Sequence, residues 1–185
     1  MPAKYQAPRI PPLHPDEWTD EQRKSLEPTY NKGRLYNMIG TFTRHPEASK
    51  AIGRVSGHIL GATSTLSPRD RELLILRTAW LCQAEYEWAQ HVLIGRQAGL
   101  TDDEITRCQQ GSEAKYWTMT EQSLLRAAEQ LHTQQKIDDA TWAALAQEFD
   151  TQQLMDIVIA VGHYTLVACA LNSFGTPLDD GLRGF

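Results

Sequence analysis

The segment CQAEYEWAQH, residues 82–91, brings together side chains that can do chemistry: a thiol, two carboxylates, a phenol, an indole and an imidazole. On one helix, Glu87 and His91 would lie about 40° apart around the axis, so their side chains could touch. A carboxylate beside an imidazole fixes the tautomer and favours the protonated form, which prepares a general acid. The same spacing also produces simple surface contacts worth about 0.3 kcal/mol, so it supports both interpretations.

The position of each other residue around the helix determines whether its side chain can share the face of His91. Ala84 and Trp88 share the face of His91 and are predicted to line a substrate site, with Tyr86 as a further donor. Large residues such as Tyr86 and Trp88 also pack in helices without any chemical role. Cys82 lies nine positions before His91 and on roughly the opposite side of a continuous helix. It is therefore not expected to partner His91 and remains a candidate only for redox chemistry.

A divalent metal could use Glu87 and His91 as two ligands, but the sequence contains neither HExxH nor the Glu-x-x-His repeat of di-iron bundles. A metal site would need His58 or His163 from across the fold. We therefore predict no metal and no cofactor. His163 lies in an apolar segment and is predicted to be a buried, hydrogen-bonded histidine that can also bind substrate in the same cavity.

Helical elements must position these side chains, because helix signals recur along the chain and strand signals hardly appear. Residues 67–70, SPRD, place a hydroxyl cap, a proline and an acid at a helix start. Gly99 closes a second helix that begins near Glu85, and TDDE at residues 101–104 is a capping box that opens a third. Further helices are expected at residues 46–60, 120–134, 139–149 and 151–174. The sequence predicts an all-α fold, a single-domain helical bundle.

The first 33 residues contain six prolines and are predicted to form an arm, residues 1–33, with one short helix after Thr19. The helical domain is predicted to span residues 34–185. Arms of this kind often pack on a neighbouring subunit.

Composition and charge exclude several classes of partner. The formal net charge of -5, with basic residues scattered, disfavours nucleic-acid binding. The proline-rich N-terminus does not resemble a secretory signal, so we expect a cytoplasmic protein. The apolar segment 154–171 carries Asp156, His163 and Tyr164, which are costly in hydrocarbon, so it is read as a central helix or a subunit interface and no membrane is expected. Three widely spaced cysteines disfavour structural disulfides and a thiolate zinc site.

Residues 69–105, RDRELLILRTAWLCQAEYEWAQHVLIGRQAGLTDDEI, resemble the carboxymuconolactone decarboxylase family, which includes an alkylhydroperoxidase D-like branch. The resemblance is close in this block and looser over most of the chain. It implies an alkylhydroperoxidase D-like helical fold and a homo-oligomer, whether dimer, trimer or hexamer. In one branch it also implies peroxidase (peroxiredoxin) activity.

The peroxidase branch has a glutamate, a CxxC pair and a histidine at fixed spacing. Aligned on His91, this pattern places the glutamate at Glu72 but the two cysteines at Ala84 and Glu87. Both thiols are missing, and Cys82 is two positions away with no neighbouring thiol to resolve a sulfenic acid. The chain therefore resembles a thiol-free variant of the family.

The resemblance to the thiol-free side implies a lyase that decarboxylates a lactone or β-keto-type carboxylic acid, with Glu72, Glu87 and His91 as catalytic residues. Loss of carbon dioxide leaves an enolate, which needs stabilisation and a proton donor. Arg71 and Arg77 are candidates, by proximity alone, for holding a substrate carboxylate. Two alternatives remain open: a thiol peroxidase centred on Cys82, and a non-catalytic oligomeric binding protein.

Overall fold

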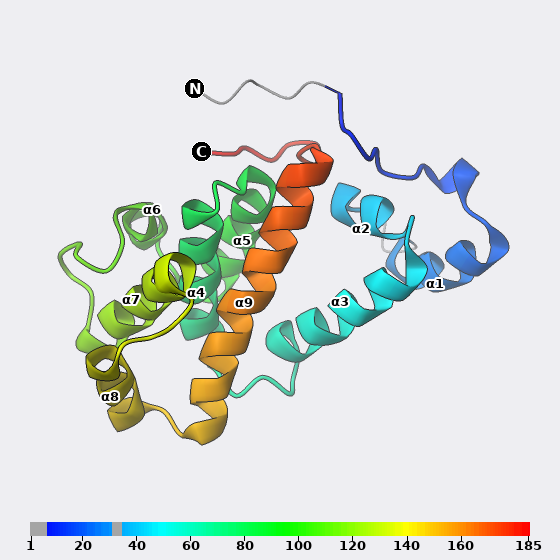
Figure 1. The fold of residues 1–185 in the computed structure, drawn as a ribbon. Coiled ribbons are helices and arrows are strands. Elements are labelled where there is room, and N and C mark those ends of the chain that lie inside the picture. Colours follow the sequence, from blue (N-terminus) through cyan, green and yellow to red (C-terminus); the bar gives the residue numbers. More distant parts are fainter. Residues whose placement is uncertain (1–6, 31–34) are drawn as a thin grey trace.

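The computed structural model describes residues 7–30 and 35–185, and all regular elements in these ranges are helices (Figure 1). In chain order they are a 3-10 helix Pro15–Glu17, α1 Asp20–Tyr30, α2 Asn37–Phe42, α3 Pro46–Leu60, α4 Pro68–Leu81, α5 Glu85–Gln97, α6 Asp102–Gln110, α7 Met119–Gln134, α8 Asp139–Glu148 and α9 Thr151–Phe174. The predicted all-α fold class is confirmed. The sequence did not predict α2 or the 3-10 helix.

The expected helix ends are present because side chains satisfy the free backbone groups there. Ser67 Oγ accepts a hydrogen bond from Asp70 N at 3.1 Å and begins α4. Thr101 and Glu104 form the capping box of α6. Gly175, in the left-handed conformation with φ of 66°, ends α9. These caps fix where the site-bearing helices begin and end.

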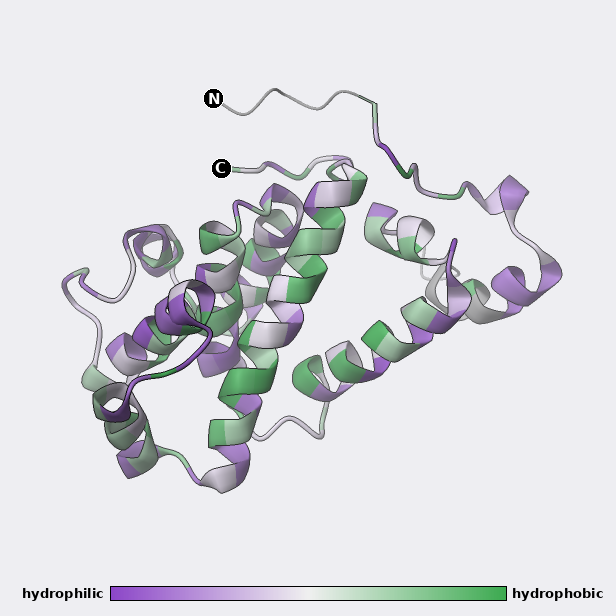
Figure 2. Cartoon of the chain, viewed as in Figure 1, coloured by the Kyte–Doolittle hydropathy of each residue, from purple (hydrophilic) through white to green (hydrophobic). Residues whose placement is uncertain are grey.

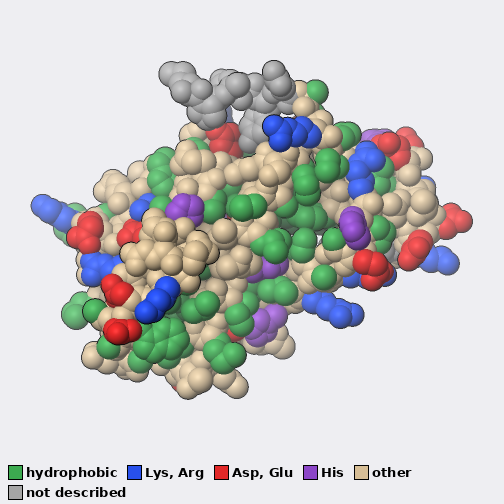
Figure 3. Space-filling view, viewed as in Figure 1, with side chains coloured by type: hydrophobic (Ala, Val, Ile, Leu, Met, Phe, Trp, Pro, Cys, Tyr) green, Lys and Arg blue, Asp and Glu red, His purple; other side chains and the backbone are tan. Residues whose placement is uncertain are grey.

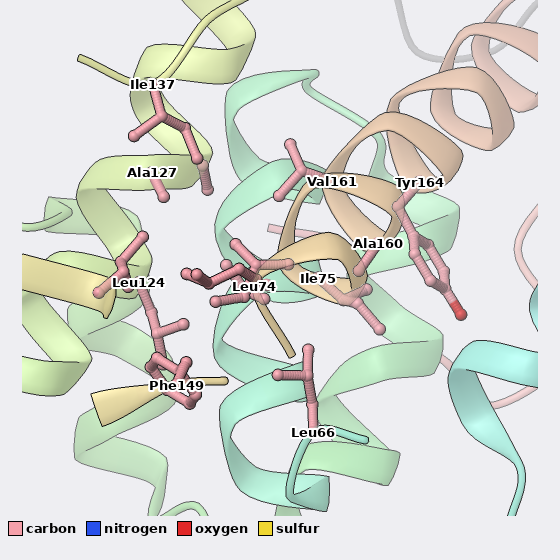
Figure 4. Packing of buried hydrophobic residues seen from close by; sticks show 14 of the residues in the cluster. Leu66, Leu74, Ile75, Leu124, Ala127, Ile137, Phe149, Ala160, Val161 and Tyr164 are labelled. Carbon is pink, nitrogen blue, oxygen red and sulfur yellow. The ribbon is translucent and has the colours of Figure 1, made fainter. Parts of the chain in front are cut away.

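The core is organised around α4, which packs against α5, α7 and α9. The four consecutive residues from Leu73 to Leu76 are fully buried, because α4 has neighbours on every side. Figure 4 shows Leu74 of α4 on the side of Leu124 of α7, and Ile75 of α4 beside Ala160 of α9. Helix α4 is therefore a rigid support for the side chains it carries.

The N-terminal helices extend from one side of this bundle. Figure 1 shows the C-terminal end of α3 beside the lower half of α9, with α3 running off at an angle toward α2 and α1. In Figure 2, α3 is hydrophobic along one edge and hydrophilic along the other. The described part of the predicted arm is fastened to the bundle, because Arg9 N and Ile10 N donate to Phe174 O at 2.8 and 3.1 Å. Residues 1–6 and 31–33 of the arm lie outside the described residues.

By length and composition, α9 could span a bilayer, but the least polar part of it is 56% buried inside this fold. A buried helix at the centre of a bundle has the same composition, and α9 packs on α4 and α7. Its remaining face exposes apolar side chains, including Met155 at 57% and Leu166 at 50%. Figure 3 shows hydrophobic side chains gathered over α9 and α3 on this face of the molecule.

Candidate active site

The segment that carries the candidate residues is a corner and not one helix. Helix α4 ends at Leu81 and α5 begins at Glu85, and between them Gln83 has a left-handed φ of 51°. The geometry predicted for a continuous helix therefore does not hold for Cys82. Its Sγ lies 3.7 Å from His132 Nδ1 on α7, and its carbonyl accepts a hydrogen bond from Asn172. The thiol is separated from His91, although for a different reason than the one predicted.

The corner places His91 of α5 against Glu72 of α4. His91 Nδ1 lies 2.7 Å from Glu72 Oε2, and Glu72 is fully buried. The other carboxylate oxygen accepts a hydrogen bond from Arg71 Nε at 3.1 Å, and Arg71 also donates to Ile59 O at 3.2 Å. Arg71, Glu72 and His91 thus form a buried chain in which each partner orients the next.

A carboxylate at Nδ1 determines which imidazole nitrogen is available for chemistry. With Glu72 as acceptor, Nδ1 carries a proton and Nε2 is left for another partner. No hydrogen bond joins Nε2 to any residue that the structure describes. Tyr164 of α9 contacts the imidazole edge-to-face, with ring centroids 4.9 Å apart. His91 is therefore held from two sides with one nitrogen unpaired.

Glu87 lies on the same helix as His91 but does not pair with it. The predicted i,i+4 contact is absent, because the imidazole is bound to Glu72 instead. Glu87 is 3% exposed, and neither of its oxygens has a hydrogen-bond partner in the described part of the chain. Burial without a partner raises the pKa of Glu87 well above its usual value, so the neutral acid is favoured.

Glu87 and His91 both face a cavity of about 490 Å³. The cavity lies between α2 and α3 on one side and α5 and α9 on the other. Its walls are mainly apolar, with contributions from Met38, Phe42, Ile52, Leu60, Ile94 and Leu171. Polar contributions come from Ser49, Ser56, Gln90, Gln97 and Tyr164. A pocket of this size and lining is typical of small-molecule sites.

Tyr86 also lines the cavity, but its hydroxyl is already engaged. It donates to Asp179 Oδ2 at 2.6 Å and accepts from Met38 N at 3.1 Å. Burial and the neighbouring Asp179 raise the pKa of the Tyr86 phenol. Tyr86 therefore joins α5 to α2 and to the chain after α9, and so shapes the cavity wall.

Three predicted substrate-binding residues are not part of the cavity lining. The indole of Trp88 packs against Trp80 and Phe185, with ring centroids 5.8 and 5.9 Å away. Ala84 is fully buried at the N-cap of α5 and does not reach the cavity. His163 lies behind the wall, where Nε2 is 2.8 Å from Ser56 Oγ.

Tyr164, Ser56 and Arg71 gained site roles that the sequence did not assign. Tyr164 and Ser56 come from α9 and α3, and only the tertiary fold brings them to α5. The guanidinium of Arg71, a candidate clamp for a substrate carboxylate by proximity alone, binds Glu72 and the carbonyl of Ile59 instead. Arg77 binds Glu129 and the carbonyls of Cys108 and Gln109, away from the cavity.

Comparison with solved structures shows the fold. A peroxidase-related protein with an alkylhydroperoxidase AhpD core from Ralstonia eutropha JMP134 superposes with a TM-score of 0.82 at 18% identity, over 96% of this chain and 95% of that chain. A peroxidase-related protein from Silicibacter sp. TM1040 gives a TM-score of 0.80 at 17% identity, over 96% of each chain. The debrominase Bmp8 in complex with 2,3,4-tribromopyrrole gives 0.75 at 15% identity, over 92% of this chain and 91% of that chain.

No curated protein sequence matches the chain. Residues 46–130, which include α4, α5 and all three candidate catalytic residues, match the sequence model of the carboxymuconolactone decarboxylase family. The fold and the sequence therefore agree: the chain has the alkylhydroperoxidase D-like fold, and its residues 46–130 match the carboxymuconolactone decarboxylase family.

Proposed function

We propose that the protein is a small-molecule lyase that decarboxylates a lactone or β-keto-type carboxylic acid. The observation that carries this proposal is the pairing of His91 with Glu72 beside the unpartnered Glu87, with His91 and Glu87 facing one cavity. The arrangement supplies two proton-bearing groups and includes no nucleophilic thiol. It supports acid–base chemistry better than redox chemistry.

In the proposed reaction, the carbon–carbon bond to the substrate carboxylate breaks and carbon dioxide leaves. The electron pair of that bond passes to the adjacent carbonyl and forms an enolate. His91, which in this step must be the doubly protonated imidazolium, gives the Nε2 proton to the carbon that held the carboxylate and becomes neutral. Water then returns a proton to Nε2 and leaves as hydroxide. Glu72 keeps the imidazole oriented throughout, because its carboxylate accepts from Nδ1.

Glu87 is proposed to act as a neutral acid that donates a hydrogen bond to the enolate oxygen. Its pKa is raised by burial, and both of its oxygens lack partners among the described residues. A protonated carboxyl in an apolar site can stabilise developing negative charge in this way. The apolar walls also exclude water from the substrate carboxylate.

The debrominase of the same fold binds 2,3,4-tribromopyrrole, so the fold can hold a small ring compound. A ligand of that kind would fit a cavity of about 490 Å³. We further propose that the protein acts in the cytoplasm as a homo-oligomer. The apolar face that α9 exposes supports the proposed assembly.

The test is to incubate the protein with a panel of β-keto acids and lactone acids and to measure the carbon dioxide that is released. Turnover of at least one acid by the wild type and its loss in His91→Gln would support the proposal. His132→Gln is the matched control, because His132 contacts Cys82 and lies outside the cavity lining. Equal rates in the wild type and His91→Gln would exclude the assigned role.

A further inference from the structure

The wall opposite His91 contains a second polar group that the proposed reaction does not use. Ser56 lies on α3 and lines the cavity, whereas Glu87 and His91 lie on α5. Behind it, His163 of α9 places Nε2 2.8 Å from Ser56 Oγ. The hydroxyl is therefore oriented by a histidine that does not itself line the cavity.

Ser56 has bonding capacity left for a ligand. A serine hydroxyl offers one donor and two acceptor positions, and the contact with His163 uses one of these three. The cavity-facing residues of α3 are otherwise small or apolar, namely Ile52, Gly53 and Leu60 beside Ser49. A hydroxyl on such a wall loses water when a ligand enters, so a ligand group that restores the hydrogen bond is favoured.

The Ser56 and His163 pair carries no net charge. Burial lowers the pKa of His163, so its imidazole is neutral near pH 7. A neutral subsite is matched to a neutral partner, such as a hydroxyl or a carbonyl, and gives no Coulombic attraction for an anion.

Two other bonds also fasten this end of α3 to the bundle. His58 Nε2 lies 2.8 Å from Asp156 Oδ1 on α9. Arg71 of α4 donates to Ile59 O at 3.2 Å. These two links provide the structural connection that would otherwise be the simplest explanation of the Ser56 contact.

We propose that Ser56, positioned by His163, forms a second subsite that binds a neutral hydroxyl or carbonyl group at the end of the substrate away from the reacting carboxylate. This proposal rests on the proposed function of the cavity. The substrate is then an acid with its reacting end at Glu87 and His91, an apolar body and a neutral polar group that meets α3.

The test uses ketones that resemble decarboxylation products and are not turned over: acetophenone and its 2′-, 3′- and 4′-hydroxy isomers. Dissociation constants are measured by NMR titration for the wild type and for variants at Ser56, His163 and His58. In the wild type, at least one hydroxy isomer is expected to bind about five- to tenfold more tightly than acetophenone, as one neutral hydrogen bond allows.

The variants distinguish a role of His163 in orienting the Ser56 hydroxyl from a general role in folding. Ser56→Ala is expected to abolish the preference for the hydroxy isomer while acetophenone binds unchanged, and Ser56→Thr to retain it. His163→Phe is expected to reduce the preference, whereas His58→Gln, which breaks a neighbouring link between α3 and α9, leaves it intact. A purely structural role of His163 would weaken all four ketones equally.

The proposal is overturned if no ketone binds, if all four bind equally to the wild type, or if Ser56→Ala keeps the preference. These measurements need no catalysis. A hydroxyl preference without turnover of any acid would therefore reject the proposed reaction and support the subsite.

Discussion

Glu87 and His91 stand one turn apart on α5, yet the imidazole pairs with Glu72 on α4 and the Glu87 carboxyl has no hydrogen-bond partner in the described chain. The carboxyl groups of Glu72 and Glu87 therefore have different environments, although both belong to the site of His91. Glu72 is bound to both Arg71 and His91, while Glu87 is buried and faces the cavity. Environment, and not residue type, therefore assigns one carboxyl to orientation and the other to proton donation.

Glu72→Gln should lower both stability and turnover. The substitution removes the carboxylate that neutralises Arg71 and leaves that guanidinium buried without its counter-charge. Breaking a buried pair in this way costs about 3 kcal/mol of unfolding free energy. Urea unfolding measures the loss, with Glu113→Gln as control, since Glu113 pairs with Arg126 at the surface. Equal losses in the two variants would contradict the buried chain.

The raised pKa of Glu87 predicts a specific dependence of stability on pH. The folded state holds this proton more tightly than the unfolded state, so the stabilising contribution is complete below pH 4.5 and is lost as pH rises toward the folded pKa. Relative to Glu87→Gln, the wild type should lose up to about 1.4 kcal/mol of unfolding free energy per pH unit in this range. If the unfolding free energies of the two proteins change in parallel with pH, the pKa of Glu87 is not raised in the folded state.

Cys82→Ala should leave turnover and cavity binding unchanged. Burial raises the pKa of Cys82 to about 11, so little reactive thiolate is present at neutral pH. The thiol also lies outside the cavity lining. Peroxide consumption by the wild type and the variant is the measurement. Peroxidase activity that disappears in Cys82→Ala would favour the alternative redox function.

Leu166→Lys should weaken the proposed homo-oligomer. Leu166 is 50% exposed on the apolar face of α9, where a charge would be buried against a second copy. Light scattering should show a smaller particle than the wild type. Met119→Lys is the control, because Met119 is 87% exposed at the start of α7. A wild-type protein that is monomeric by light scattering would contradict the proposed homo-oligomer.

Local signals in the sequence were sufficient for most helices, because caps act over three or four residues. Ser67, Thr101 and Gly175 mark helix ends in the structure as the sequence predicted. Helix α2 was missed because no side chain caps its start, and its six residues lie beside the proline-rich arm. Short, uncapped helices depend on tertiary packing, which local patterns do not record.

The candidate site was only partly predictable for the same reason. The spacing of Glu72 and His91 was recognised from the family resemblance, and the fold brings these residues into contact. The left-handed turn at Gln83 was not predicted, and it changes the direction of every side chain between Cys82 and Ala84. Ser56 and Tyr164 are distant in sequence, so only the packing of α3 and α9 on α5 places them at the cavity.

The central claim is that His91 delivers the proton to carbon, and decarboxylation in D2O tests it most directly. The wild type should form a ketone with one deuterium at the carbon that lost carbon dioxide, at a single face where that carbon is prochiral. His91→Gln should slow this reaction by about a hundredfold or more, as expected for loss of a general acid, while folding and ketone binding are retained. A His91→Gln variant that decarboxylates at the wild-type rate would contradict the claim.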